Sequence, residues 1–205
     1  MKTEILPTDR ARSLMQAFKE LWNGELVAFP TDTVYGLGAF AFDAKAIQKL
    51  YEVKGRENSK AIPILLSKAG QLSQVTNGMN PMAQRLAGRF WPGPLTLVVP
   101  RHPDLPEIIS PTPTIGVRMP DNPVALALID LTGPLAVTSA NLSGQPSALD
   151  AQEAYEQLNG RIPLILDGGR TRAGIASTVV DCTQDELVVL RQGPLSEQEL
   201  RQALT

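Results

Sequence analysis

Three cationic side chains, Lys54, Arg56 and Lys60, lie within the seven-residue segment KGRENSK. Only Glu57 offsets them, so three positive charges and one negative charge leave the segment at +2. Such a segment can clamp phosphate, because an arginine donates paired hydrogen bonds to phosphate oxygens and a lysine adds a compact point charge. The same residues would also suit the solvated end of a helix, where cations complement the helix dipole.

Small polar side chains follow two apolar runs elsewhere in the chain. The segment PTDTVYGLG, residues 30–38, offers two threonines and an aspartate, and its two glycines allow a close approach of the backbone to a ligand. The segment SAN offers Ser139 and Asn141 where the run LAVTSA ends. These groups can bind a phosphate, a sugar or an amino acid, or they can simply close local turns.

Arg118 stands inside the apolar segment TIGVRMP, and a charge in such a strand rarely stays unpaired. A ligand carboxylate and a buried aspartate would serve equally well as its partner. Ser177 in IASTVVD and Arg191 in VVLRQG are again polar residues that border a predicted strand. The number of these features, more than any one of them, indicates a pocket for an anionic ligand of several parts.

The chain has one cysteine, Cys182, and one histidine, His102. These numbers exclude an intramolecular disulfide, a cysteine-based metal cluster and a histidine pair for zinc, and they argue against a Ser–His–Asp triad. We expect no metal bound by the protein. Cys182 is predicted to be an inert core thiol, and His102 a solvated loop residue.

Helices and strands are predicted to alternate along the chain, with strands concentrated towards the C-terminus. The predicted helices cover residues 11–22, a segment from Asp43 to the KGR motif, 81–90, 122–131, 151–158 and a short stretch from 196. The predicted strands cover residues 26–30, 62–67, 95–100, 115–120, 135–140, 163–167, 177–182 and 187–193. The order indicates an α/β or α+β fold with an open, twisted, mixed sheet flanked by helices.

Length and composition are those of an ordinary globular protein. The 205 residues, 43% hydrophobic and 20% charged, fit one domain over residues 1–205. No apolar run approaches the ~20 residues that span a bilayer, and the start lacks a signal-peptide pattern. We therefore expect a cytoplasmic protein with no membrane contact. The net charge of −2 gives no global nucleic-acid signature, although a local basic patch can still bind RNA.

Taken together, these segments resemble the YrdC-like family of threonylcarbamoyl-AMP synthases. The resemblance runs from about residue 25 to residue 193 and is carried, in order, by PTDTVYGLG, KGR, WPGPLT, TIGVRMP, SANLSGQPS, DGG, STVVD and LRQG. It implies a YrdC-like domain with a concave, positively charged face.

The resemblance also implies a reaction. Members of this family make threonylcarbamoyl-AMP and pyrophosphate from L-threonine, bicarbonate and ATP, with Mg²⁺ expected on the phosphates. Partner proteins, the tRNA threonylcarbamoyl transferases, use that intermediate to modify the adenosine beside the anticodon of certain tRNAs.

Site residues are implied by the same motifs. The resemblance places Thr33, Arg118, Ser139 and Ser177 on the threonine side. It places Lys54, Arg56, Lys60, Thr114, Asn141 and Arg191 on the ATP side, with Lys54 and Arg56 as catalytic residues.

The chain departs from the family pattern at two positions and in its extent. Glu57 stands where relatives often have proline, and Leu65 stands where some longer members have histidine. The chain ends shortly after LRQG, so the linker and second domain of longer members are not expected.

Two other functions compete with the synthase. An RNA-binding module could use the concave basic face, but only 5% of the residues are aromatic and no RNA-binding motif is present. A nucleotide-binding paralogue without threonine chemistry would keep the fold. The presence of Lys54, Arg56, Ser139 and Asn141 argues against that paralogue.

Overall fold

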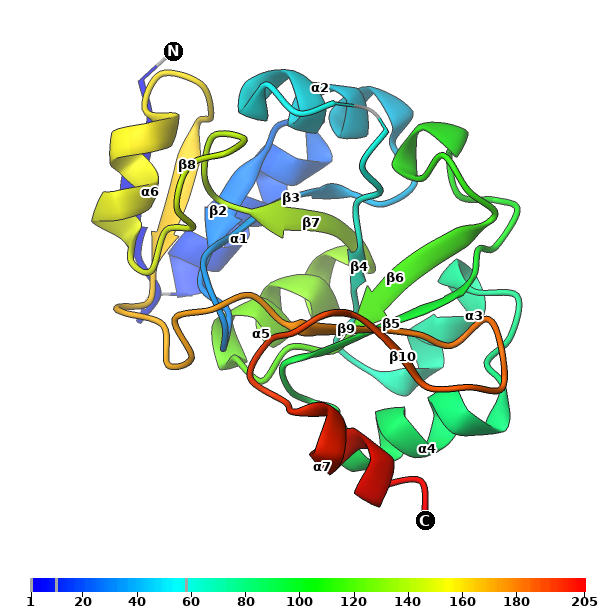
Figure 1. Cartoon of the computed structure of the whole chain (residues 1–205). Helices are drawn as coiled ribbons and strands as arrows, with labels where there is room; N and C mark the ends of the chain where they lie inside the picture. The colour runs from blue at the N-terminus through cyan, green and yellow to red at the C-terminus, as the bar shows by residue number, and fades with distance from the viewer. Residues whose placement is uncertain (1, 10, 58) are drawn as a thin grey trace.

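The computed structural model describes residues 2–9, 11–57 and 59–205. Ten strands form one open sheet in the order β1-β8-β2-β3-β7-β4-β6-β5-β9-β10 (Figure 1). The strands are β1 (Glu4–Pro7), β2 (Val27–Phe29), β3 (Gly36–Phe40), β4 (Ile64–Leu65), β5 (Leu95–Pro100), β6 (Thr114–Arg118), β7 (Leu135–Ser139), β8 (Leu164–Asp167), β9 (Thr178–Asp181) and β10 (Val188–Arg191).

The sheet is mixed, as the sequence predicts. Strands β1, β8 and β2 run parallel to one another, whereas β3 is antiparallel to both β2 and β7. On the other side of β7, β4 is parallel to β6, β5 is antiparallel to β6, and β9 is parallel to β5. The central strands are thus drawn from distant parts of the chain, which brings polar residues at several strand ends together.

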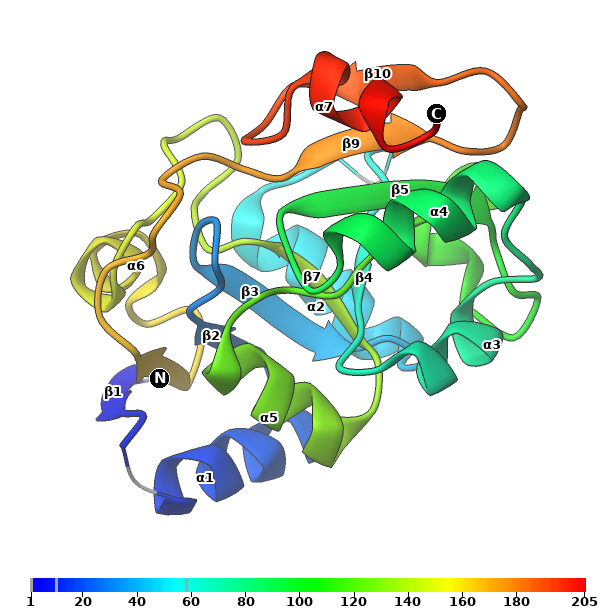
Figure 2. The same cartoon turned by 90° about the horizontal axis from the view of Figure 1, so that it is seen from below.

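Helices cover both faces of the sheet. They are α1 (Ala11–Trp22), α2 (Ala44–Lys54), α3 (Leu72–Val75), α4 (Pro81–Phe90), α5 (Pro123–Thr132), α6 (Ala151–Leu158) and α7 (Glu197–Gln202), with short 3₁₀ turns η1 (Ala69–Gln71) and η2 (Glu107–Ile109). One apolar cluster joins α1 and α5 to the sheet, and those helices lie side by side in Figure 2. A larger cluster packs α2, α4 and α6 against the sheet. Successive β2 residues alternate between the two clusters, as the two-residue period of a strand requires.

Local signals set the ends of α2, which carries the KGR motif. The Asp43 carboxylate caps its start by accepting hydrogen bonds from the amides of Lys45 and Ala46, at 2.9 and 3.1 Å. Gly55 ends it in the left-handed conformation, with φ 58°. The helix therefore ends where the sequence predicts and delivers Arg56 into the following loop.

Two strands were not predicted. Residues 36–40 follow a polar turn and contain two glycines, which disfavour strands, yet they form β3. A Cβ atom on Gly36 would lie 2.7 Å from Val137 Cγ1, and one on Gly38 would lie 2.8 Å from Phe29 Cε1. The glycines thus allow close packing between strands. The other unpredicted strand, β1, lies at the edge of the sheet and is mostly exposed. In addition, β4 is shorter than the predicted strand over 62–67.

The chain's only cysteine and only histidine behave largely as expected. Cys182 is 2% exposed, which confirms a core position, and burial raises the pKa of its thiol to about 12, a direction that disfavours the reactive thiolate. His102 lies in the loop after β5, partly exposed, where its Nδ1 accepts a hydrogen bond from the Asp104 amide at 3.2 Å. In the described part of the chain, none of the helices has the length and apolar run needed to span a bilayer.

Candidate functional site

A cavity of about 280 Å³ opens over the central strands. Five of the predicted site residues line it: Thr33, Arg56, Ser139, Ser177 and Arg191. They are contributed by the loop before β3, the loop after α2, the end of β7, the residue before β9 and the end of β10. The topology therefore gathers these five residues, from segments spread across the chain, into a single pocket.

Hydroxyl groups form one wall of the cavity. The hydroxyl of Thr31 donates its one hydrogen to the Val34 carbonyl, at 2.7 Å. In the 2.9 Å hydrogen bond between Thr31 Oγ1 and Thr33 Oγ1, Thr33 is therefore the donor and Thr31 the acceptor. The loop between β8 and β9 supports this wall through two hydrogen bonds. The Ala173 amide donates to the carbonyl of residue 32, and the Gly174 amide donates to the Thr33 carbonyl, both at 3.1 Å. The position of Thr33 is thus fixed by its own turn and by a distant loop.

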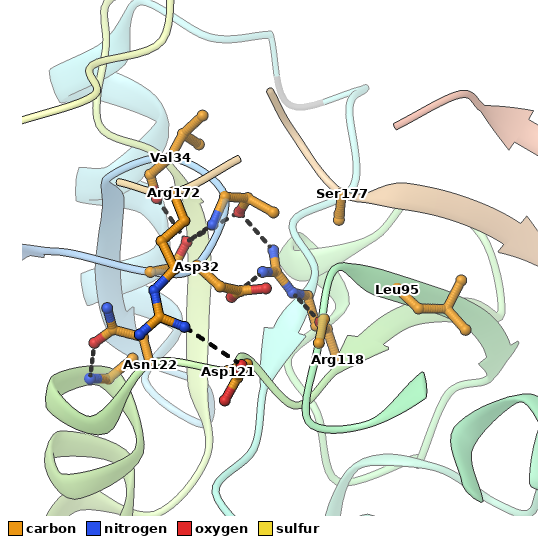
Figure 3. A network of polar contacts seen from close by, with 12 residues as sticks. Asp32, Val34, Leu95, Arg118, Asp121, Asn122, Arg172 and Ser177 are labelled. Carbon is orange, nitrogen blue, oxygen red and sulfur yellow. Dashed lines mark hydrogen bonds and ion pairs between the residues drawn. The ribbon is translucent and has the colours of Figure 1, made fainter. Parts of the chain in front are cut away.

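Arg118 lies behind this wall, 5% exposed, and does not itself line the cavity. Its Nη1 donates to Thr33 Oγ1 at 2.9 Å, its Nε donates to the Gly93 carbonyl at 3.0 Å, and its Nη2 pairs with the Asp32 carboxylate (Figure 3). Burial lowers the pKa of Arg118, and Asp32 opposes that shift. Of the two partners that the sequence left open, the structure shows the buried aspartate. Each terminal nitrogen keeps one further N–H.

A second part of the cavity wall is built around Ser177. Its hydroxyl lies 2.8 Å from Thr96 Oγ1 and accepts from Arg191 Nη2 at 3.1 Å. Arg191 also donates from Nε and Nη2 to the Ser177 carbonyl, at 3.0 and 2.9 Å. Thr96 lines the cavity and was missed from the sequence. The sequence feature that could have indicated Thr96 is that it is the only hydroxyl-bearing residue in the apolar strand LTLVVP.

Two arginines face the cavity together. Arg56 is held by its own loop, with Nη2 donating to the Ala61 carbonyl at 3.1 Å. Burial lowers the pKa of Arg191, and the nearby Arg56 lowers it further. Among the described residues that line the cavity there is no carboxylate to neutralise them. Such a pair is suited to bind an anion.

Lys54 is placed differently from Arg56. It is 2% exposed, it does not line the cavity, and its Nζ donates to the main-chain oxygens of Ser139 and Asn141. Burial, and then Arg56, lower the pKa of its ammonium to about 7.

Three further predicted residues lie outside the cavity wall. Asn141 is 6% exposed and donates from Nδ2 to the carbonyls of Leu142 and Gln145, both at 2.8 Å, while its Oδ1 has no partner in the described part of the chain. The Lys60 side chain is 54% exposed. Thr114 Oγ1 lies 2.8 Å from Thr112 Oγ1.

The lowered pKa of Lys54 predicts a pH dependence of stability. Between pH 7 and the ordinary lysine pKa of 10.5, the unfolded chain binds more protons at this group than the folded chain. Stability should therefore rise with pH in that window, by up to about 1.4 kcal/mol per pH unit from this group. Urea unfolding of the wild type and Lys54→Met at several pH values measures it. The variant should lack this part of the slope, and parallel curves would contradict the assignment.

Known proteins resemble this chain over most of its length. A family model for Sua5, YciO and YrdC, described as "Telomere recombination", matches residues 19–193. A threonylcarbamoyl-AMP synthase of Bacillus subtilis is 44% identical over 190 residues, which are 91% of this chain and 55% of that protein. The present chain thus spans little more than half the length of that relative.

Two solved structures share the fold. P. abyssi Sua5 complexed with L-threonine matches with a TM-score of 0.95 and 41% identity, over 98% of this chain and 61% of that one. E. coli YciO matches with a TM-score of 0.86 and 25% identity, over 97% of this chain and 99% of that one. From its sequence and from its fold, the chain belongs to the Sua5/YciO/YrdC family.

Proposed function

We propose that this chain is an L-threonylcarbamoyladenylate synthase, which forms threonylcarbamoyl-AMP and pyrophosphate from L-threonine, bicarbonate and ATP. The observation that carries the proposal is one cavity lined both by the hydroxyl groups of Thr33 and Ser139 and by a pair of arginines, Arg56 and Arg191. Two relatives support it, because the B. subtilis protein is a threonylcarbamoyl-AMP synthase and P. abyssi Sua5 was solved in complex with L-threonine.

The reaction requires no protein nucleophile. The threonine amine adds to carbon dioxide and loses a proton, or adds to bicarbonate with loss of water, to give a carbamate. A carbamate oxygen then attacks the α-phosphorus of ATP. A bond forms between that oxygen and phosphorus, and the bond to the β-phosphate bridging oxygen breaks, so pyrophosphate leaves with the electron pair. The protein needs to align the two reactants and neutralise the phosphates, which are positional and electrostatic tasks.

On the threonine side, we propose that Thr33, Ser139 and Ser177 bind the amino acid, with Thr96 orienting Ser177 through their 2.8 Å contact. Arg118 fixes Thr33 from behind and has one free N–H on each terminal nitrogen for the threonine carboxylate.

On the ATP side, we propose that Arg56 and Arg191 neutralise the phosphates. Lys60, Thr114 and Asn141 would contact the parts of the nucleotide that extend beyond the cavity wall. The described residues contain no group of three or more potential metal ligands from His, Cys, Asp and Glu. Mg²⁺ would therefore be held chiefly by the triphosphate, as is usual for this ion.

The wider setting is also a proposal. We infer a single domain over residues 1–205, supported by the match to nearly all of the E. coli YciO chain. Use of the product by tRNA threonylcarbamoyl transferases, contact with RNA and a cytoplasmic location remain predictions from the sequence.

Pyrophosphate release tests the function directly. The purified protein with ATP and Mg²⁺ should release pyrophosphate only when both L-threonine and bicarbonate are present, because the attacking carbamate contains atoms of both. Omitting each in turn is the measurement, and serine in place of threonine gauges specificity. Release that needs neither would indicate a nucleotide hydrolase. No release from a folded protein would favour the paralogue or the RNA-binding module.

A further inference from the structure

The ammonium of Lys54 lies beneath the loop that follows β7, not on the cavity wall. We infer that Lys54 is a positioning residue, which holds residues 139–143 so that Ser139 stays on the cavity wall, and that it does not touch the substrates. The inference rests on the proposed function, because it gives Lys54 a part in binding L-threonine through Ser139.

The loop is attached to the last residue of α2 at three points. Lys54 Nζ donates to the carbonyls of Ser139 and Asn141, and the Ser143 amide donates to the Lys54 carbonyl at 2.8 Å. Between these points the Ala140 amide donates to the Tyr35 carbonyl, also at 2.8 Å. Residues 139, 141 and 143 of the loop thus bind to Lys54, Ala140 binds to the segment before β3, and the Leu142 amide donates to Gln157 Oε1 on α6 at 3.0 Å. The loop cannot shift as a unit without breaking its bonds to Lys54.

The turn at Gly55 directs the side chains of Lys54 and Arg56 to different parts of the structure. Gly55 adopts φ 58° and ψ 39°, a conformation that glycine takes without strain. The chain reverses there, so Lys54 reaches the loop after β7 while Arg56 reaches the cavity wall. The structure therefore explains physically why KGR and SAN occur together in one chain: the lysine of the first binds the backbone of the second.

Removing the Lys54 nitrogen would take this donor from the Asn141 carbonyl and would leave the Ser139 carbonyl with the Asn141 amide, which donates to it at 2.9 Å. Buried polar groups that lose their partner are costly, so the loop would rearrange to find new donors. A neutral lysine amine still carries two N–H groups, enough for both carbonyls. The attachment therefore survives a change of pH near neutrality, and substitution is the informative perturbation.

Chemical labelling of the wild-type protein tests the placement without any variant. Acetic anhydride is applied with and without ATP, and each lysine is followed by mass spectrometry. Lys54 should stay unmodified in both conditions, because its nitrogen is buried and bound to two carbonyls. Lys60, with its side chain 54% exposed, should be acetylated in the free protein and serves as the reagent control. Acetylation of Lys54 in the free protein would overturn the inference, and protection by ATP would then identify a phosphate ligand.

Threonine binding without ATP tests the positioning role. Calorimetry should give a dissociation constant for L-threonine about tenfold or more weaker in Lys54→Met, since a displaced Ser139 loses its contact. Lys68→Met, which removes only a surface ion pair with Asp130, is the matched lysine control.

The outcomes separate the inference from the function on which it rests. An unchanged threonine affinity in folded Lys54→Met would overturn the positioning role. If that variant does not fold, the labelling of the wild type tests the inference instead: an unmodified Lys54 supports it, and an acetylated Lys54 overturns it. If the wild type binds neither threonine nor ATP, the proposed function fails, while labelling still reports whether Lys54 is bound to the loop.

Discussion

Replacing Arg56 with alanine is expected to lower kcat/KM for ATP about 10²–10³-fold, by analogy with the loss of one preorganised donor from an oxyanion site. Arg56 lines the cavity, and its loop holds it in place through the Ala61 carbonyl at 3.1 Å. Its charge is therefore already positioned before the phosphates arrive, and nothing has to be reorganised when negative charge develops. Steady-state pyrophosphate release at varied ATP concentration measures the loss.

The matched control for Arg56 is another arginine outside the site. Arg85 on α4 is exposed and donates to the Leu204 carbonyl at 3.1 Å. Arg85→Ala should keep kcat/KM within about twofold of the wild type, because a surface cation distant from the reacting groups contributes little. Equal activities of the two variants would remove Arg56 from the phosphate site.

Helices with a clear apolar period could be predicted from the sequence almost to the residue. The predicted helices over 11–22, 81–90 and 151–158 coincide with α1, α4 and α6. Their signals are local, since the repeat of apolar residues and the capping side chains lie within each segment. The missed strand β3 is the opposite case. Its glycines favour a turn locally, and only the packing of Phe29 and Val137 against it, from β2 and β7, reveals a strand.

The residue types of the site could be predicted, but not all of their partners. The sequence singled out Arg118 as a charge that needs a partner. Its partner Asp32 lies 86 residues away and comes beside it only through the sheet. Lys54 and Arg56 looked equivalent in the sequence because they are two residues apart. Their side chains point to different places because of the turn at Gly55 and the position of β7. Neither feature can be recognised from the residues next to KGR alone.

Breaking the buried pair of Asp32 and Arg118 should have the largest effect on stability. Both side chains are nearly inaccessible, at 9% and 7% exposed. Asp32→Leu leaves the buried guanidinium of Arg118 without its counter-charge, and Arg118→Met leaves the buried carboxylate of Asp32 without its counter-charge. Each single variant is expected to lower the free energy of unfolding by about 3–5 kcal/mol, the usual cost of removing one member of a buried pair. Urea denaturation of the three proteins measures it.

The double variant Asp32→Leu, Arg118→Met separates stability from function. Apolar residues of similar volume often replace a buried pair at little cost, so the double variant should be more stable than either single variant. Its threonine affinity should still be at least about tenfold weaker than that of the wild type, because Thr33 Oγ1 has lost the hydrogen bond from Arg118 Nη1 at 2.9 Å. A double variant that regains both stability and threonine affinity would show that the pair only fills space. Regained stability without affinity would instead show that Arg118 acts on the site, because the fold would be intact while the contact of Arg118 with Thr33 and its proposed contact with the threonine carboxylate would be missing.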